Sequence, residues 1–253
     1  MSDPKPPSTS SDAGALPDRL VMGLQPAREA IRVHGARITR VLVEKGSSPT
    51  LDAVARFAKD SGAKVERAGR GELDRLARGG RHQGVIAFVP PLALVPLEEV
   101  DPSLVVALDE LEDPQNFGAV IRSAVAWGAT AVLFPEHHAA PLTPATFRAS
   151  AGAVEHATLC RVGSLPKALE TLKAKGARVV GLEAQAKPSI DACDLARPTV
   201  LVLGAEGKGL RKPVKAVCDE LARLPMSGPV ASLNASVALG IALYEAVRQR
   251  GAR

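Results

Sequence analysis

Short apolar runs recur along the second half of this 253-residue chain, and stretches with helical character separate most of them. The runs have the length and the Val and Leu content of buried strands, and they lie at residues 104–109, 131–134, 157–162, 178–182, 200–203 and 221–225. A long final helix is expected over residues 232–249. This alternation predicts an α/β fold with a mainly parallel sheet covered on both faces. Ligands of such sheets bind beyond the carboxyl ends of the strands.

A smaller α/β unit is predicted to precede this sheet. Helices are expected near residues 26–34, 51–61 and 72–77, and strands near 38–43, 63–67 and 84–89. Three prolines between residues 90 and 96 disfavour regular structure there. We therefore expect a first domain at residues 19–90, a Pro-rich linker at 91–101 and a second domain at 102–253. Residues 1–18 are polar and rich in Pro and Ser, and they predict a disordered tail.

The positive charge of the chain is concentrated in its first domain. Residues 19–95 carry fourteen Lys and Arg against seven Asp and Glu, whereas residues 96–253 carry seventeen of each sign. A local basic excess is typical of proteins that bind a polyanion, because neutralising phosphates releases counterions. The alternative is a basic surface that only solvates the domain.

Several classes of protein are disfavoured by the sequence. No apolar run is long enough for a transmembrane helix and no signal peptide is visible, so we expect a soluble, cytoplasmic protein without a membrane partner. The three cysteines, Cys160, Cys193 and Cys218, are widely spaced and predict reduced, mostly buried thiols. His137 and His138 have no further ligand at metal-binding spacing, so no metal is expected.

Three loops that follow predicted strands concentrate glycine and small polar residues. In the first, Asn116 is expected to cap a helix and Arg122 to lie on its second turn. The second, 203–210, holds three glycines, but it matches neither a P-loop nor the dinucleotide fingerprint. The third, 224–236, ends in hydroxyl and amide groups at the start of the final helix, where they predict either a cap or a ligand clamp. Each loop alone is ambiguous.

Together, in this order and spacing, the loops resemble the three motifs of the SpoU, or TrmH-like, family of RNA ribose methyltransferases. The motifs are Asn116-x-Gly118-x-x-x-Arg122, Gly204-x-Glu206-x-x-Gly209 and Ser232-Leu233-Asn234-x-Ser236. The first domain is similar to the substrate-binding domain of this family, which has a ribosomal-protein L30e-like fold. That similarity rests on Met22-Gly23 before a helix and on Arg81-His82-Gln83-Gly84-Val85 at the last strand.

The resemblance implies a trefoil-knotted, parallel-sheet SPOUT methyltransferase domain behind a small L30e-like α/β RNA-binding domain. It implies S-adenosyl-L-methionine as cofactor, RNA as substrate, and a homodimer with the active site at the interface. By motif position, it assigns catalytic roles to Arg122, Asn116, Glu206 and Asn234. The cofactor pocket is expected to include Gly204, Leu224, Met226, Leu233, Ser232 and Ser236.

The reaction constrains what Arg122 can do. A guanidinium is a poor proton acceptor near neutral pH, so we expect Arg122 to stabilise developing charge on the ribose oxygen or to hold the adjacent phosphate. A true base role is the alternative. Within the family, the layout is most similar to enzymes that methylate a guanosine of bacterial 23S rRNA.

Other functions are left open by the sequence. Within the family, the alternatives are a tRNA ribose methyltransferase and a relative that confers thiostrepton resistance. A non-catalytic RNA-binding ribosome-assembly factor would keep the fold, but it has no need for the polar set of Asn116, Arg122, Glu206 and Asn234. A nucleotide-dependent oxidoreductase is disfavoured, because no glycine fingerprint follows the first strand.

Overall fold

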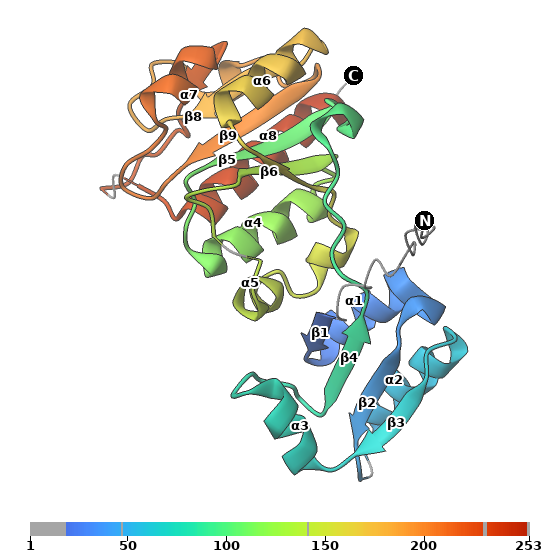
Figure 1. Cartoon of the computed structure of the whole chain (residues 1–253). Coiled ribbons are helices and arrows are strands. Elements are labelled where there is room, and N and C mark those ends of the chain that lie inside the picture. The colour runs from blue at the N-terminus through green and yellow to red at the C-terminus, as the bar shows by residue number, and fades with distance from the viewer. Residues whose placement is uncertain (1–18, 47, 141, 230–231, 252–253) are drawn as a thin grey trace, which may run out of the picture.

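The structure is a computed structural model that describes residues 19–46, 48–140, 142–229 and 232–251. It contains two β-sheets, one in each part of the chain (Figure 1). The predicted tail of residues 1–18 lies outside the described residues. No helix among the described residues is both long and apolar enough to span a membrane.

The N-terminal sheet has four strands in the order β1-β4-β2-β3. They are β1 (Arg19–Met22), β2 (Arg40–Glu44), β3 (Val65–Ala68) and β4 (Val85–Val89). β2 and β3 run parallel, whereas β4 lies antiparallel to both β1 and β2. The sequence predicts β2, β3 and β4 but not β1, because four residues after a polar tail carry too little pattern.

Helices cover both faces of this sheet. α1 (Leu24–His34) and α2 (Pro49–Asp60) share one apolar core with the strands, and α3 (Arg70–Ala77) packs on the opposite face. α1 buries Ala27, Ala30 and Ile31, which lie on one stripe of the helix. A layer of helix on each side of a sheet leaves the charged residues outside.

The Arg81-His82-Gln83-Gly84 motif builds the turn into β4. The Nδ1 atom of buried His82 accepts from the Gly84 N–H at 3.0 Å, and its Nε2 atom lies 2.9 Å from Asp74 Oδ1. The Gln83 Oε1 atom accepts from the Leu24 N–H at 3.1 Å, at the start of α1. These bonds give the His and Gln of the motif a structural role within the domain.

The C-terminal sheet has six parallel strands in the order β10-β8-β9-β5-β6-β7. They are β5 (Leu104–Asp109), β6 (Ala131–Pro135), β7 (Leu159–Val162), β8 (Arg178–Leu182), β9 (Thr199–Gly204) and β10 (Glu220–Ala222). All six lie at or within two or three residues of the predicted strands, which confirms the parallel α/β fold. The strand order reverses between β5 and β9, and such a switch point opens a crevice for ligands.

Helices lie on both faces of this sheet as well. α4 (Pro114–Ala126) and α8 (Ala235–Gly251) share one core with the strands, and α6 (Leu165–Ala174) and α7 (Lys212–Val217) share the other. α5 (Pro144–Ala149) packs against α4. Short 3-10 turns occur at Gly35–Arg37, Leu97–Glu99, Ala153–His156 and Ile190–Ala192.

The two parts of the chain touch at the 3-10 turn Ala153–His156, η3. The buried carboxylate of Glu155 accepts from both terminal nitrogens of Arg19, at 2.8 and 2.6 Å. The same carboxylate lies 2.9 Å from His34 Nε2. The Arg19 guanidinium also lies 4.8 Å from the centre of the Phe147 ring on α5. Specific polar groups therefore hold β1 and α1 against the C-terminal part.

The predicted linker is partly attached to the C-terminal sheet. Leu94 pairs with Leu159 of β7, and the Val95 N–H donates to the Leu159 carbonyl at 2.9 Å. Leu92 and Leu94 also pack against the core of this sheet. The domain limits at residues 90 and 102 stay predictions, and so does the trefoil knot.

Candidate functional site

The ends of β5 and β9 place two of the motif loops side by side. Asp109 and Gly204 are the last residues of these strands and are partners in the parallel register. The fully buried carboxylate of Asp109 accepts from the backbone N–H of Arg211 at 2.8 Å and from its Nε at 2.7 Å. This hydrogen bonding raises the pKa of Arg211 above its usual value. Asp109 thus ties the end of the glycine-rich loop to β5.

The helix that follows β5 begins earlier than the sequence predicts. Asp113 caps α4 by accepting from the N–H groups of Gln115 and Asn116, each at 3.1 Å, and Pro114 occupies the first helical position. The expectation that Asn116 caps this helix is therefore wrong. Asn116 lies inside the first turn, where its side chain is free for other contacts, and Arg122 moves to the third turn.

Asn116, Glu206 and Asn234 form a closed hydrogen-bonded triangle. Asn116 Nδ2 donates to Glu206 Oε1 at 3.0 Å, and Asn234 Nδ2 donates to the same oxygen at 3.0 Å and to Asn116 Oδ1 at 2.8 Å. The Ala235 N–H adds a longer bond to Glu206 Oε1 at 3.4 Å. One residue of each sequence motif takes part, so the three loops are held at one place.

Asn234 also caps the final helix. Its Oδ1 atom accepts from the N–H groups of Ser236 and Val237, at 3.0 and 3.4 Å, and from the Ser236 hydroxyl at 2.6 Å. Both polar atoms of the Asn234 side chain are therefore used, one for the helix and one for the triangle. This explains why an amide is needed at that position.

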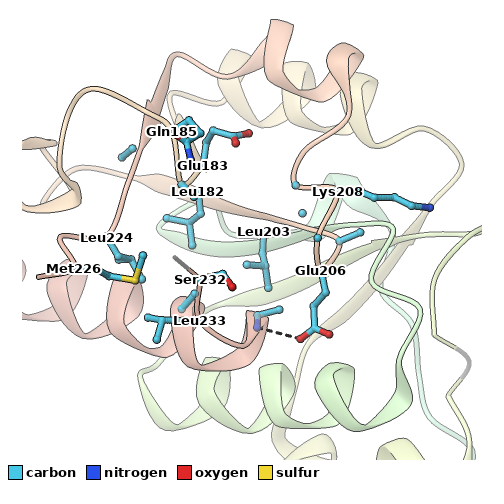
Figure 2. Close-up of a pocket in the computed structure, with 18 residues that line it drawn as sticks. Leu182, Glu183, Gln185, Leu203, Glu206, Lys208, Leu224, Met226, Ser232 and Leu233 are labelled. Atoms are coloured by element: carbon cyan, nitrogen blue, oxygen red, sulfur yellow. Dashed lines mark hydrogen bonds between the residues drawn. The ribbon is translucent and has the colours of Figure 1, made fainter. Parts of the chain in front are cut away.

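A pocket of about 350 Å³ lies beside the triangle, at the carboxyl ends of β8, β9 and β10 (Figure 2). Apolar side chains form much of its wall, among them Leu182, Leu203, Leu224, Met226 and Leu233. Of the six residues expected in a cofactor pocket, Gly204, Leu224, Met226, Ser232 and Leu233 line it, and Ser236 does not. Ser236 instead turns toward Asn234.

The glycine-rich loop 205–209 forms one wall of the pocket. A Cβ atom at Gly204 would stand 2.3 Å from the carbonyl carbon of Gly209, so only glycine allows this close approach. The Gly209 N–H donates to the Ala205 carbonyl at 2.9 Å and closes the loop. Glu206 and Lys208 are exposed, and Figure 2 shows Lys208 pointing away from the apolar wall.

Sequence reasoning missed two polar residues that line the pocket and a third that anchors one of its loops. Glu183 and Gln185, which follow β8, line the pocket, and Glu183 forms an ion pair with Lys215 of α7. Asp109 accepts a hydrogen bond from the backbone N–H of Arg211, at the end of the glycine-rich loop. The only signal in the sequence was their position, since each follows or ends an apolar strand of a parallel sheet.

Arg122 does not join the pocket of its own chain. It is absent from the pocket lining and is exposed, and its side chain forms no hydrogen bond or ion pair with another described residue. On α4, Gly118 faces α5 and Ser123 lies toward Gly240 of α8. Helical geometry therefore places Arg122 on the open face between α5 and α8.

An apolar stripe covers the same open side of the molecule. Val237, Ile241 and Tyr244 of α8 are 41–50% exposed, and the ring of Trp127, which is also exposed, meets Tyr244 edge-on at 5.5 Å. We call these four residues the α8 stripe. Phe117, in contrast, is buried and packs against the ring of Phe134.

The remaining predicted residues are also placed. Cys160 and Cys193 are buried, Cys218 is partly buried, and all three are free thiols, as predicted. His137 and His138 are exposed, and His138 lies 3.7 Å from Glu112. Within the described parts of the chain, no three His, Cys, Asp or Glu side chains are grouped to hold a metal.

Fold and site together define a two-domain α/β protein with a small-molecule pocket at the end of a parallel sheet. Residues 103–244 match the family model of the SpoU rRNA Methylase family. Residues 20–95 match the model for RNA 2′-O ribose methyltransferase substrate binding. The chain therefore belongs to the SpoU family and is an RNA 2′-O-ribose methyltransferase.

Individual relatives agree with this assignment. The chain is 39% identical to a 23S rRNA (guanosine-2′-O-)-methyltransferase of Pseudomonas putida, over 91% of this chain and 96% of that protein. It is 39% identical to an uncharacterised tRNA/rRNA methyltransferase of Mycolicibacterium vanbaalenii, over 91% of this chain and 76% of the relative. Among solved structures it resembles the SpoU methyltransferase AviRb of Streptomyces viridochromogenes in complex with AdoMet. That match has a TM-score of 0.76, 28% identity, and covers 93% of this chain and 92% of the other.

Proposed function

We propose that this protein transfers a methyl group from S-adenosyl-L-methionine to the ribose 2′-hydroxyl of a guanosine in 23S rRNA. The observation that carries the proposal is the triangle of Asn116, Glu206 and Asn234, which unites the three family motifs beside a small-molecule pocket. The substrate is proposed from the Pseudomonas putida relative, whose name specifies a guanosine of 23S rRNA. The basic excess of residues 19–95 supports an RNA substrate.

The pocket fits S-adenosyl-L-methionine in size and chemistry. Its volume of about 350 Å³ lies within the usual range for small-molecule sites. Leucine side chains suit the adenine ring and the methionine carbons, while the loop after Gly204 presents backbone N–H and carbonyl groups. When bound, the cofactor supplies an electrophilic methyl group and a neutral thioether that leaves. The relative AviRb was solved with the same compound.

Side chains of this protein hold the ribose in position and stabilise the charge that develops on it. The 2′-oxygen releases its proton to solvent water as it bonds to the methyl carbon. Negative charge develops on this oxygen in the transition state, and a guanidinium donates hydrogen bonds to such an oxygen. We assign this role to Arg122, with the adjacent phosphate as a second acceptor. Asn116, Glu206 and Asn234 keep the motif loops in register and so position both reactants.

A homodimer brings Arg122 to a pocket. In one chain, Arg122 lies outside the pocket, on the open side that also carries the α8 stripe. Exposed apolar groups in such a contiguous stripe are typical of protein interfaces. A second copy docked on this stripe buries it and presents the Arg122 of one protomer to the pocket of its partner. Size-exclusion chromatography with light scattering tests the dimer, and Ile241→Glu is expected to yield monomers without methyl transfer.

Methyl transfer itself is the first test. The protein is incubated with radiolabelled S-adenosyl-L-methionine and unmodified bacterial rRNA or, separately, tRNA, with Arg122→Ala as the control. Label recovered as 2′-O-methylguanosine from 23S rRNA, and lost in the variant, supports the proposal. Label on tRNA alone supports the proposed reaction but contradicts 23S rRNA as the substrate. Cofactor binding without label on any RNA favours a non-catalytic assembly factor.

The cellular location follows from the substrate. Bacterial rRNA is made and modified in the cytoplasm, and we propose that the protein acts there. Measuring its distribution between cytosolic, ribosome-bound and membrane fractions of cells tests this directly. Recovery with large-subunit precursor particles is expected, and recovery in the membrane fraction contradicts it.

A further inference from the structure

A second cleft, of about 720 Å³, lies between the N-terminal domain and α5. Its walls come from β1, from the end of α3 with the turn after it, and from α5. Figure 1 shows the turn between α3 and β4 extending toward α5. The cleft is separate from the cofactor pocket, since the two share no lining residue.

The charged side chains of this cleft are all arginines. Arg75, Arg78 and Arg148 line it, no carboxylate does, and all three arginines are exposed. No hydrogen bond or ion pair joins the guanidinium group of any of them to another described residue. Some other arginines of the N-terminal domain are compensated, since Arg19 and Arg67 both pair with carboxylates. Three uncompensated guanidinium groups facing one cleft predict an anionic ligand.

The positions of the arginines are fixed by packing. Arg78 follows the last residue of α3 and adopts the left-handed conformation, with φ 45°. Two residues later, a Cβ atom at Gly80 would stand 3.2 Å from Met22 Sδ. The turn is therefore pressed against β1. On the other wall, α5 packs against both α4 and β1. The walls of the cleft are thus held in place, and α5, which forms one of them, packs against α4, the helix that carries Arg122.

We propose that this cleft holds the phosphodiester backbone of the substrate RNA as it passes from the N-terminal domain toward Arg122. The planar guanidinium binds phosphate through two parallel hydrogen bonds, which favours arginine at such sites. Contacts of this kind position a nucleic acid without reading its sequence. The inference rests on RNA being the substrate, and it adds Arg148 of the methyltransferase domain to the RNA-binding surface.

The test replaces Arg75, Arg78 and Arg148 by Gln, singly and together, in the full chain. The probe is bacterial 23S rRNA transcribed in vitro, and its affinity is measured between 0.05 and 0.3 M KCl. Because each single-strand phosphate contact contributes about 0.7 to the salt slope, each variant loses about fivefold in affinity at 0.1 M KCl. The triple variant loses about a hundredfold, and its slope falls by about 2.

Arg56→Gln is the matched control. Arg56 is exposed and unpaired like the cleft arginines, but it lies on α2, on the opposite face of the N-terminal sheet. It is expected to change RNA affinity less than twofold. S-adenosyl-L-methionine affinity, measured by calorimetry, is expected to stay unchanged in all variants and shows that they are folded.

Two outcomes distinguish a failure of the cleft proposal from a failure of the proposed function. If the triple variant binds RNA as Arg56→Gln does, with the same salt slope, while wild type methylates RNA, the cleft proposal is overturned and the function stands. If wild type neither binds nor methylates RNA, the function itself fails. A raised KM for RNA in Arg148→Gln, with kcat nearly unchanged at saturating RNA, supports a positioning role for this residue.

Discussion

Asn234 donates its side-chain amide to the side-chain oxygen of Asn116 at 2.8 Å, although the two residues are 118 positions apart in the chain. Asn234 Nδ2 uses both of its N–H groups, since it also donates to Glu206 Oε1, and Asn116 Nδ2 donates to the same oxygen. An asparagine offers a donor and an acceptor on one planar group, and here both are used. The triangle therefore fixes α4, the glycine-rich loop and the start of α8 relative to one another.

Replacing Asn116 with Asp is expected to break the triangle. The change is nearly isosteric, but it replaces the donor that faces Glu206 Oε1 at 3.0 Å with a second carboxylate oxygen. Like charges at this distance repel, and the loop 205–209 that lines the pocket loses an anchor. We expect S-adenosyl-L-methionine affinity to fall by about tenfold or more, since a lost charged hydrogen bond is worth roughly 1.5–3 kcal/mol. Calorimetric titration measures it.

Gln115→Glu provides the control for this variant. Gln115 is the preceding residue on α4, is exposed, and uses only its backbone N–H in the helix cap, so the same charge is added without touching the triangle. Its cofactor affinity is expected to match wild type. Equal losses in both variants would point to a general effect of negative charge near the pocket and would falsify the positioning role of Asn116.

Asn116→Asp also makes the dimer testable. A heterodimer of Asn116→Asp and Arg122→Ala chains, prepared by co-expression with two tags, contains one intact pocket and one intact Arg122, on different chains. If Arg122 acts across the interface, then at a cofactor concentration too low to fill the Asn116→Asp pocket this heterodimer regains up to about half of wild-type methyl transfer, while each homodimer stays well below it. No recovery contradicts the shared site.

The sequence predicts the strands of the large sheet well, because each is a continuous apolar run such as 104–109 or 199–204. It places the loops after the strands at one edge of the sheet, but the strand order that brings the ends of β5 and β9 together is known only from the structure. The sequence fails to predict the start of a helix where two residues that could each cap it lie close together. Asp113 and Asn116 are both good helix caps, and only Pro114 at the first helical position favours Asp113.

Contacts between distant parts of the chain do not appear in the sequence as a periodic pattern of apolar residues. Nothing in the sequence distinguishes Glu155 and Asp109 from surface carboxylates, yet both are buried because their partners, Arg19 and Arg211, come from distant parts of the chain. The absence of Arg122 from the pocket of its own chain is of the same kind. A motif fixes the spacing of residues along the chain, whereas the arrangement of helices decides which pocket a side chain can reach.

Gly118→Ala is expected to destabilise the protein. Its Cβ atom would lie 2.4 Å from the Thr146 carbonyl oxygen and 2.5 Å from Ala149 Cβ, so α4 and α5 must separate. Overpacking costs about 1–3 kcal/mol, which outweighs the gain of up to about 1 kcal/mol that alanine brings to a helix. Urea unfolding followed by circular dichroism measures the change.

The control for Gly118 is a second helical glycine. At Gly240 of α8 the nearest atom to an added Cβ is Ser123 Oγ, at 3.8 Å, which is an ordinary contact. Gly240→Ala is therefore expected to be neutral or more stable by up to about 1 kcal/mol. If Gly118→Ala is as stable as Gly240→Ala, the close packing of α4 on α5 is not present in solution.

The thiols are expected to resist alkylation in the folded protein. Burial raises the pKa of Cys193 to about 12 and that of Cys218 to about 11, and it raises the pKa of Cys160 as well. Because the thiolate is the reactive form, little of it exists at pH 8. Iodoacetamide at pH 8 is expected to modify all three cysteines only after unfolding. Near pH 10, the partly buried Cys218 should react first, as peptide mass spectrometry would show. Prompt labelling of Cys218 at pH 8 contradicts this.

Glu155→Ala is expected to release the N-terminal domain from the C-terminal part. The variant leaves Arg19, whose side chain is 10% exposed, without a counter-charge, and it removes the partner of His34. Removing one member of a buried pair costs about 3–5 kcal/mol. We expect a larger radius of gyration by small-angle scattering and faster hydrogen exchange in α1. RNA affinity should fall too, because Arg148 no longer faces Arg75 and Arg78 across the cleft.

Glu66→Ala serves as the control for this variant, since its carboxylate pairs with Lys64 on the exposed surface of the N-terminal domain alone. Exposed ion pairs contribute at most about 1 kcal/mol, so scattering, exchange and RNA affinity should all match wild type. If Glu155→Ala behaves in the same way, the domains are held by their other contacts, such as Glu29 with His156 at 2.9 Å. A double variant with His156→Ala then decides between these two contacts.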